Sequence, residues 1–142
     1  GIGLNIEKGS LADVPELNDV NYAPAGTTPL YDAIGLSIDS LEEVQGQVLF
    51  IILTDGEENA SQQFDKEEIL KRISNRTEQG WKFVFLGCDI DAMKQSEDLG
   101  IAPGNARSYS RAESQGVMCD VASATVEYSV RSPRDKRGFF EK

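Results

Sequence analysis

The sequence has no histidine and only two cysteines among its 142 residues. Without histidine, a Ser-His or Cys-His catalytic pair and the imidazole ligand of many metal sites are excluded. Cys88 and Cys119 lie far apart and lack the close spacing of metal-binding cysteines. We therefore expect both to be reduced, buried thiols of the kind found in cytosolic proteins.

Long apolar segments are also missing from the sequence. No apolar run approaches the roughly 18 residues that a membrane helix requires. The first residues do not form the charged and apolar pattern of a signal peptide either. These absences predict a cytoplasmic protein without a membrane partner.

Basic residues are scarce in the first half of the chain. Residues 1–70 hold 14 acidic and 2 basic side chains, whereas residues 71–142 hold 10 acidic and 12 basic ones, and the net charge is -10. This balance argues against nucleic acid as a partner, because phosphate contacts need a basic surface. It is compatible with a bound cation, although solvated acidic surface is the commoner cause of such a charge.

One apolar segment stands out, and it is followed at once by an acidic loop. Val48–Leu53 is uniformly apolar, rich in Val, Ile and Phe, and ends before Thr54-Asp55-Gly56. Such a segment predicts a strand buried on both faces, as in a parallel sheet. Asp55 would then stand at the carboxyl end of the strand, which is where ligands and metals bind in open α/β sheets.

Helical and strand patterns alternate along the rest of the chain. The predicted helices are Pro29 to about Val44, a helix capped by Asp65 and closed by Gly80, Ala92–Leu99, and a helix from Ser110 through Tyr128; the predicted strands are Trp81–Leu86 and Asn105–Ser108. Residues 1–26 are expected to form a strand and a loop, and the basic tail 131–142 to be frayed or to contact a partner. This alternation predicts one α/β domain with a doubly wound, mostly parallel sheet and helices on both faces.

Three stretches also carry a family resemblance: GTTPLYDAIG, VLFIILTDGEENAS and GWKFVFLGCDIDA. From about Asp13 to Tyr128 the chain resembles the bacterial stand-alone von Willebrand factor A domains. The resemblance implies a Rossmann-like sheet with a metal-ion-dependent adhesion site at its carboxyl edge. It assigns Asp55 and Thr28 as metal-contacting residues, with Thr27 as the alternative to Thr28, beside a binding edge formed by Gly56, Glu57, Glu58 and Asn59.

The chain departs from that family in lacking a D-x-S-x-S motif and the first strand and helix that accompany it. Three of the five metal-contacting side chains therefore have no counterpart. Mg²⁺ prefers a full set of hard oxygen ligands, so we expect a degenerate site that binds Mg²⁺ weakly or not at all, and no tightly bound cofactor. The missing strand would also leave the Val48–Leu53 edge without a neighbour.

These observations favour a protein-binding or assembly module that is not an enzyme. The Val48–Leu53 edge is expected to pair with a partner's strand, with a second copy in a homo-oligomer, or with residues 1–7 folding back. One alternative is a metal-dependent hydrolase that uses Asp55, Glu57 and Glu58, although the sequence has no phosphate-binding loop. The other is a purely structural, oligomerising domain.

Overall fold

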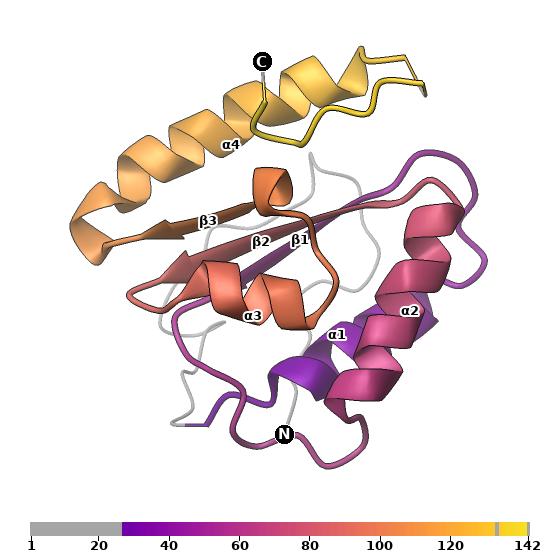
Figure 1. Ribbon diagram of the computed structural model, residues 1–142, viewed down its shortest axis with the longest axis vertical. Coiled ribbons are helices and arrows are strands. Elements are labelled where there is room, and N and C mark those ends of the chain that lie inside the picture. The colour runs from indigo at the N-terminus through magenta and orange to yellow at the C-terminus, as the bar shows by residue number, and fades with distance from the viewer. Residues whose placement is uncertain (1–26, 133, 142) are drawn as a thin grey trace, which may run out of the picture.

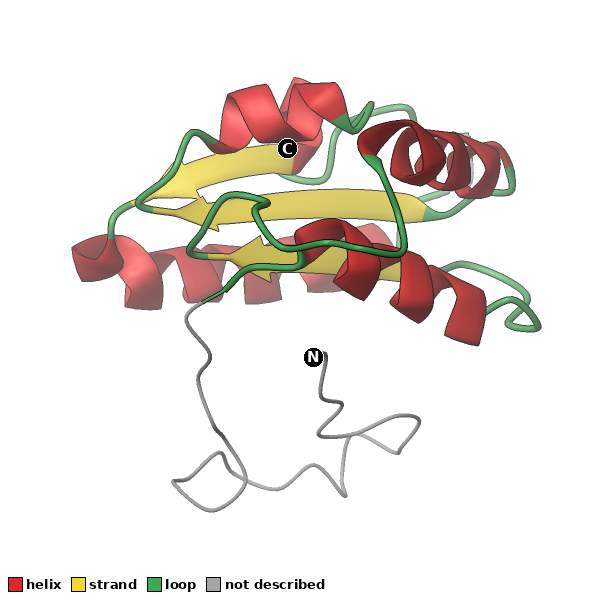
Figure 2. Cartoon of the chain, turned by 90° about the horizontal axis from the view of Figure 1, so that it is seen from below, coloured by secondary structure: helices red, strands yellow, loops and turns green. Residues whose placement is uncertain are grey.

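The computed structural model describes residues 27–132 and 134–141, and the strand and loop predicted for residues 1–26 lie outside this part. The described chain is an α/β fold with a three-stranded parallel sheet in the order β1-β2-β3, a Rossmann-like arrangement at a coarse level (Figure 1). All three strand arrows point the same way (Figure 2). The elements are α1 (Leu30–Ser40), β1 (Leu49–Thr54), α2 (Lys66–Glu78), β2 (Lys82–Cys88), α3 (Ala92–Asp98), β3 (Ala106–Tyr109) and α4 (Ser114–Ser129), with short 3-10 turns η2 (Pro103–Asn105) and η3 (Arg111–Glu113).

The sheet has a helical layer on each face. Phe83 and Phe85 of β2 point into a core that they share with α1, α2 and α3, whereas Val84 and Leu86 point into a second core beneath α4. Figure 1 accordingly shows the sheet between α4 and the other three helices. Because successive side chains of a strand face opposite sides, the continuous apolar run of β2 is buried on both faces. The sequence predicts the same burial for Val48–Leu53, and this is wrong for β1, because Ile51 and Leu53 are exposed.

Local capping signals are largely confirmed. Asp65 caps α2 as predicted and forms a capping box with Glu68, and Gly80 adopts a φ of +98° after α2. At the start of α3, Asp91 accepts a hydrogen bond from the Lys94 amide. Two helix ends differ from the prediction. The helix α1 stops at Ser40 rather than near Val44, since its apolar stripe ends at Leu41 and acidic side chains follow where the helix dipole disfavours them.

The start of α4 is the second difference, because the helix begins at Ser114 rather than at Ser110. The Ser110 hydroxyl donates to the Glu113 carboxylate, and the turn η3 precedes the helix. The two cysteines are both free, but only Cys88 is buried, because Cys119 lies on the outward side of α4. None of the helices in the described ranges combines the length and apolar character of a membrane span.

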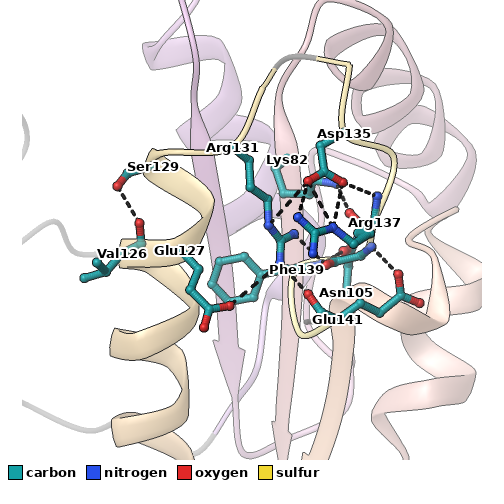
Figure 3. A network of polar contacts seen from close by, with 11 residues as sticks. Lys82, Asn105, Val126, Glu127, Ser129, Arg131, Asp135, Arg137, Phe139 and Glu141 are labelled. Atoms are coloured by element: carbon teal, nitrogen blue, oxygen red, sulfur yellow. Dashed lines mark hydrogen bonds and ion pairs between the residues drawn. The ribbon is translucent and has the colours of Figure 1, made fainter.

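Of the two alternatives predicted for the tail, fraying is wrong over residues 134–141, and a partner contact stays a prediction. Phe139 is fully buried in the core beneath α4, with its ring edge-on to those of Tyr128 and Phe140. Its amide donates to the Asn105 side chain at 2.6 Å. The Arg131 guanidinium, only 6% exposed, donates to the carbonyl oxygens of Gly138 and Glu141 (Figure 3). Aromatic burial beside a largely buried arginine therefore holds the tail against its own domain.

Replacing Phe139 should reveal this anchoring as a loss of stability. We expect Phe139→Ala to lower the free energy of unfolding by about 3 kcal/mol or more, the usual cost of removing a buried phenylalanine side chain. Phe140→Ala is the matched control, since Phe140 is only partly buried and should cost clearly less. Urea unfolding followed by circular dichroism measures both. Equal, small effects would contradict the anchoring.

Candidate functional site

The carboxyl edge of the sheet brings together the two residues that the sequence assigns to metal contact. Asp55 follows β1 directly, and Thr28 precedes α1. A methyl group placed on Gly56 would lie 2.6 Å from the Thr28 hydroxyl oxygen, so the Thr28 side chain packs against the backbone that follows Asp55. Thr28, Thr27 and Asp55 all line one open cavity of about 590 Å³. Both threonines therefore remain candidates for the same position.

A basic side chain that the sequence analysis did not predict for this site, Arg111, also lies at this edge. The Arg111 guanidinium lies 3.8 Å from the Asp55 carboxylate and 3.9 Å from that of Asp89. These are loose ion pairs, since the Arg111 and Asp55 side chains are 78% and 74% exposed, and such pairs contribute little to stability. Asp89 and Arg111 follow β2 and β3, and the carboxyl ends of parallel strands share an edge. This shared edge is the feature of the predicted sheet that could have indicated that Arg111 lies near Asp55.

Glu58 and Asn59, assigned to the binding edge, have their polar groups bonded within the chain. The Glu58 carboxylate accepts from the Tyr31 amide at 2.9 Å and from the amide and hydroxyl of Ser61 at 2.7 and 2.8 Å. Asn59 and Thr28 exchange two hydrogen bonds of 2.9 and 3.1 Å. Glu57, by contrast, is exposed. Asp55 and Glu57 are thus the acidic side chains that this loop presents to solvent.

Asp32 also joins the start of α1 to the loop that follows β1. Its carboxylate, 5% exposed, accepts hydrogen bonds of 2.8 to 2.9 Å from the backbone amides of Gln62, Gln63 and Phe64. In return, the Asp32 amide donates to the Ser61 hydroxyl. The segment from Thr28 into the second turn of α1 is therefore tied to the loop after β1 at four residues: Thr28, Tyr31, Asp32 and Gly35, whose backbone packs against the ring of Phe64.

Asp32 and Glu58 join the segment before α1 to the loop after β1, and we call them the locking carboxylates. Their pKa values reflect the hydrogen bonds that they accept. For both Asp32 and Glu58, burial raises the pKa, but the hydrogen bonds that each carboxylate accepts outweigh it, and the net pKa lies below the ordinary value. Across the sheet edge, burial and the neighbouring Cys88 raise the pKa of Tyr109. Asp32 and Glu58 are therefore ionised at neutral pH and serve as structural acceptors.

The cation-binding capacity of this edge is small. Thr28 offers one hydroxyl oxygen and Asp55 one carboxylate, and Arg111 already lies beside that carboxylate. Within residues 27–132 and 134–141, no group of three or more acidic or cysteine side chains is placed to hold a metal ion. What the edge offers instead is a cavity with hydroxyl, carboxylate and guanidinium groups around it.

The locking carboxylates should make stability depend on acid pH. Since the folded pKa values of Asp32 and Glu58 are depressed, their contribution is complete above the unfolded value of about 4. It is lost as the pH falls through the folded values. We expect the double variant Asp32→Asn, Glu58→Gln to be less stable than wild type at neutral pH, with a difference that shrinks below about pH 4. Urea unfolding across pH measures this, with Glu67→Gln as an exposed control. A difference that does not change with pH would contradict the locking role.

Comparison with known proteins assigns neither a family nor a function to these residues. A search of protein-family models, of curated proteins and of solved structures finds no match to this chain. The resemblance to von Willebrand factor A domains consequently rests on the motifs around Thr28 and Asp55, and it stays a prediction.

Proposed function

We propose that the protein is a binding or assembly module that takes up an extended strand along the outer edge of β1. The observation that carries this proposal is that, among the described residues, no strand pairs with the outer edge of the apolar strand β1. In the described part of the chain, β2 is the only neighbour of β1. The side chains of Ile51 and Leu53 are 39% and 57% exposed. Strands of parallel sheets are normally covered on both faces, whereas the α4 side of β1 is left partly uncovered at Ile51 and Leu53, next to this edge.

The backbone of β1 supports strand addition at that edge. The Lys82 amide donates to the Val48 carbonyl oxygen at 2.9 Å. Because main-chain groups alternate in direction along a strand, Phe50, Ile52 and Thr54 also turn their amides and carbonyls toward β2. Those of Leu49, Ile51 and Leu53 then point outward. The strand contains no lysine, no proline and no bulge, the usual devices that block pairing at an edge.

The surroundings of the edge would also cover an added strand. Leu30 and Ala33 of α1, Leu53 of β1 and Ser114 of α4 line the same cavity. Since α1 and α4 pack on opposite faces of the sheet, a strand added at the carboxyl end of β1 would meet residues of both helical layers there. Strand addition of this kind gains affinity from main-chain hydrogen bonds and specificity from the flanking pockets.

Metal has at most a secondary part in this proposal. The site of Thr28 and Asp55 is degenerate and lies next to the end of the proposed strand groove. Hydrolysis through Asp55, Glu57 and Glu58 has less support, because the Glu58 carboxylate is engaged by Tyr31, Ala60 and Ser61. A binding role, unlike hydrolysis, does not require a catalytic group.

A synthetic strand provides the direct test. A peptide of alternating valine and threonine, flanked by glutamines, should bind and perturb the amide resonances of Leu49, Ile51 and Leu53 in NMR titrations. The same peptide with N-methylated backbone amides should not bind, since it keeps the side chains but loses the donors. Sedimentation velocity in parallel reports whether a second copy occupies the edge. A strictly monomeric protein that binds neither peptide would refute the proposal.

A matched pair of variants localises the interaction. We expect Leu53→Lys to weaken peptide binding or self-association by about tenfold, equivalent to about 1.4 kcal/mol. The substitution places a charge at the proposed groove. Met93→Lys, at an exposed apolar position on α3, should leave binding unchanged. Equal effects of both variants would indicate a general effect of charge.

Metal dependence is tested separately. We expect the peptide affinity to be the same with excess Mg²⁺ and with EDTA, because one carboxylate and one hydroxyl make a poor Mg²⁺ site. Calorimetry of wild type and Asp55→Ala with Mg²⁺ and Mn²⁺ should give equal, negligible heats. A heat lost in Asp55→Ala would show that the site is functional.

A further inference from the structure

The tail lies in a groove between the end of α4 and the start of β3, and the contacts there are those of a peptide-binding site. We propose that this groove docks a segment of another protein chain in which glycine precedes two aromatic residues, and that the chain's own tail occupies it in competition with such a segment. We call it the tail groove, and its residues are Gly104, Asn105, Arg107, Tyr128 and Arg131.

The tail groove accepts hydrogen bonds from two successive amides of the tail. The side-chain oxygen of Asn105 accepts from the Phe139 amide at 2.6 Å. The carbonyl oxygen of Gly104 accepts from the Phe140 amide at 3.2 Å. Both acceptors belong to the short turn η2. The groove therefore binds the main chain of the segment and not only its side chains.

Arg131 binds the main chain from the other side. Its guanidinium donates to the carbonyl oxygen of Gly138 at 2.9 Å and to that of Glu141 (Figure 3). The Arg131 side chain is almost fully buried, so these donors are held in place beneath the tail. Main-chain hydrogen bonds combined with side-chain pockets are the means by which proteins bind extended peptides.

Two aromatic rings fill the side-chain pockets of the groove. Phe139 is fully buried, and the centroids of its ring and that of Tyr128 lie 6.2 Å apart. The guanidinium of Arg107 lies 4.3 Å from the centroid of the Phe140 ring, within the range of a cation–π contact. Phe140 is only partly buried, and a cavity of about 410 Å³ borders both rings. A competing segment therefore reaches the groove from solvent.

The residue before the two rings has to be glycine. A methyl group placed on Gly138 would lie 2.8 Å from both the Cα atom and the carbonyl oxygen of Gly104. These are backbone atoms, which cannot move aside as the end of a flexible side chain can. Glycine is the residue that permits so close an approach of two main chains. The groove therefore selects a glycine at this position.

The connection between α4 and the docked residues is held mainly by its own side chains. Arg137 and Asp135 form an ion pair at 2.5 Å, and the Asp135 amide donates to the Ser132 carbonyl oxygen at 2.9 Å. Toward the sheet, Lys82 donates to the Arg137 carbonyl oxygen over 3.5 Å. The docked residues can thus leave the groove as a unit. A short tether keeps them at an effective concentration on the order of millimolar, so they compete strongly with a segment in solution.

Releasing the tail should open the groove to a free peptide. The probe is a fluorescently labelled peptide with the sequence of residues 134–141. Phe139→Ala removes the buried ring, and Gly138→Ala introduces the clash with Gly104. We expect both variants to bind the peptide about tenfold more tightly than wild type, or better, because the tethered competitor is weakened. Gly116→Ala is the matched control, since a methyl group there meets no atom within 4 Å. It should bind the peptide as wild type does. Fluorescence anisotropy measures all four affinities.

A second peptide and a stability measurement complete the test. The same peptide with alanine in place of its glycine should bind both released variants about tenfold more weakly, which is about 1.4 kcal/mol. The original peptide should also raise the urea midpoint of Phe139→Ala, because a ligand of the folded state stabilises it. This measurement remains informative if the variant is partly unfolded. The proposal is overturned if neither variant binds the peptide and no stability is restored. Equal binding by wild type and both variants, or of both peptides, would overturn it as well.

Discussion

The mutual locking of two loops is the constraint on which the carboxyl edge of this protein depends. Asp32 gathers three backbone amides of the loop after β1, and Glu58 of that loop accepts from the first turn of α1. These bonds join segments about thirty positions apart in the sequence. They fix where Thr28 and Asp55 lie relative to each other, and they fix the direction in which α1 leaves the sheet. Leu30 and Ala33 of α1 in turn line the cavity at the carboxyl edge of the sheet.

This constraint separates two kinds of acidic residue that look alike in the sequence. Asp32 and Glu58 are engaged by backbone amides and act as internal connectors. Asp55 and Glu57 are exposed, and Asp55 makes only a loose ion pair with Arg111. The motif TDGEENAS therefore contains internally hydrogen-bonded and exposed acidic residues within a few positions of each other. The loop can keep its shape even where the metal-binding set is incomplete, because the shape depends on the connectors and not on a metal.

The sequence predicts the local features well and the long-range ones poorly, for a physical reason. The capping of α2 by Asp65, the cap at Asp91 and the turn at Gly80 depend on neighbours within a few residues, so their signals are readable in place. The bond between Asp32 and the loop at Gln62 is set by tertiary packing, as are the approach of Arg111 to Asp55 and the burial of Phe139. Only the order of the strands, which puts their carboxyl ends at one edge, could have indicated the position of Arg111.

The burial of Phe139 also bears on how the chain acquires its structure during synthesis. The core shared by α1, α2 and α3 is complete once β3 has formed, since Ala106 is its last member along the described chain. The core under α4 needs Phe139, more than thirty residues later. Domains generally fold as units during synthesis. The core beneath α4 therefore cannot be completed until Phe139 has left the exit tunnel, although the residues of the other core have emerged earlier.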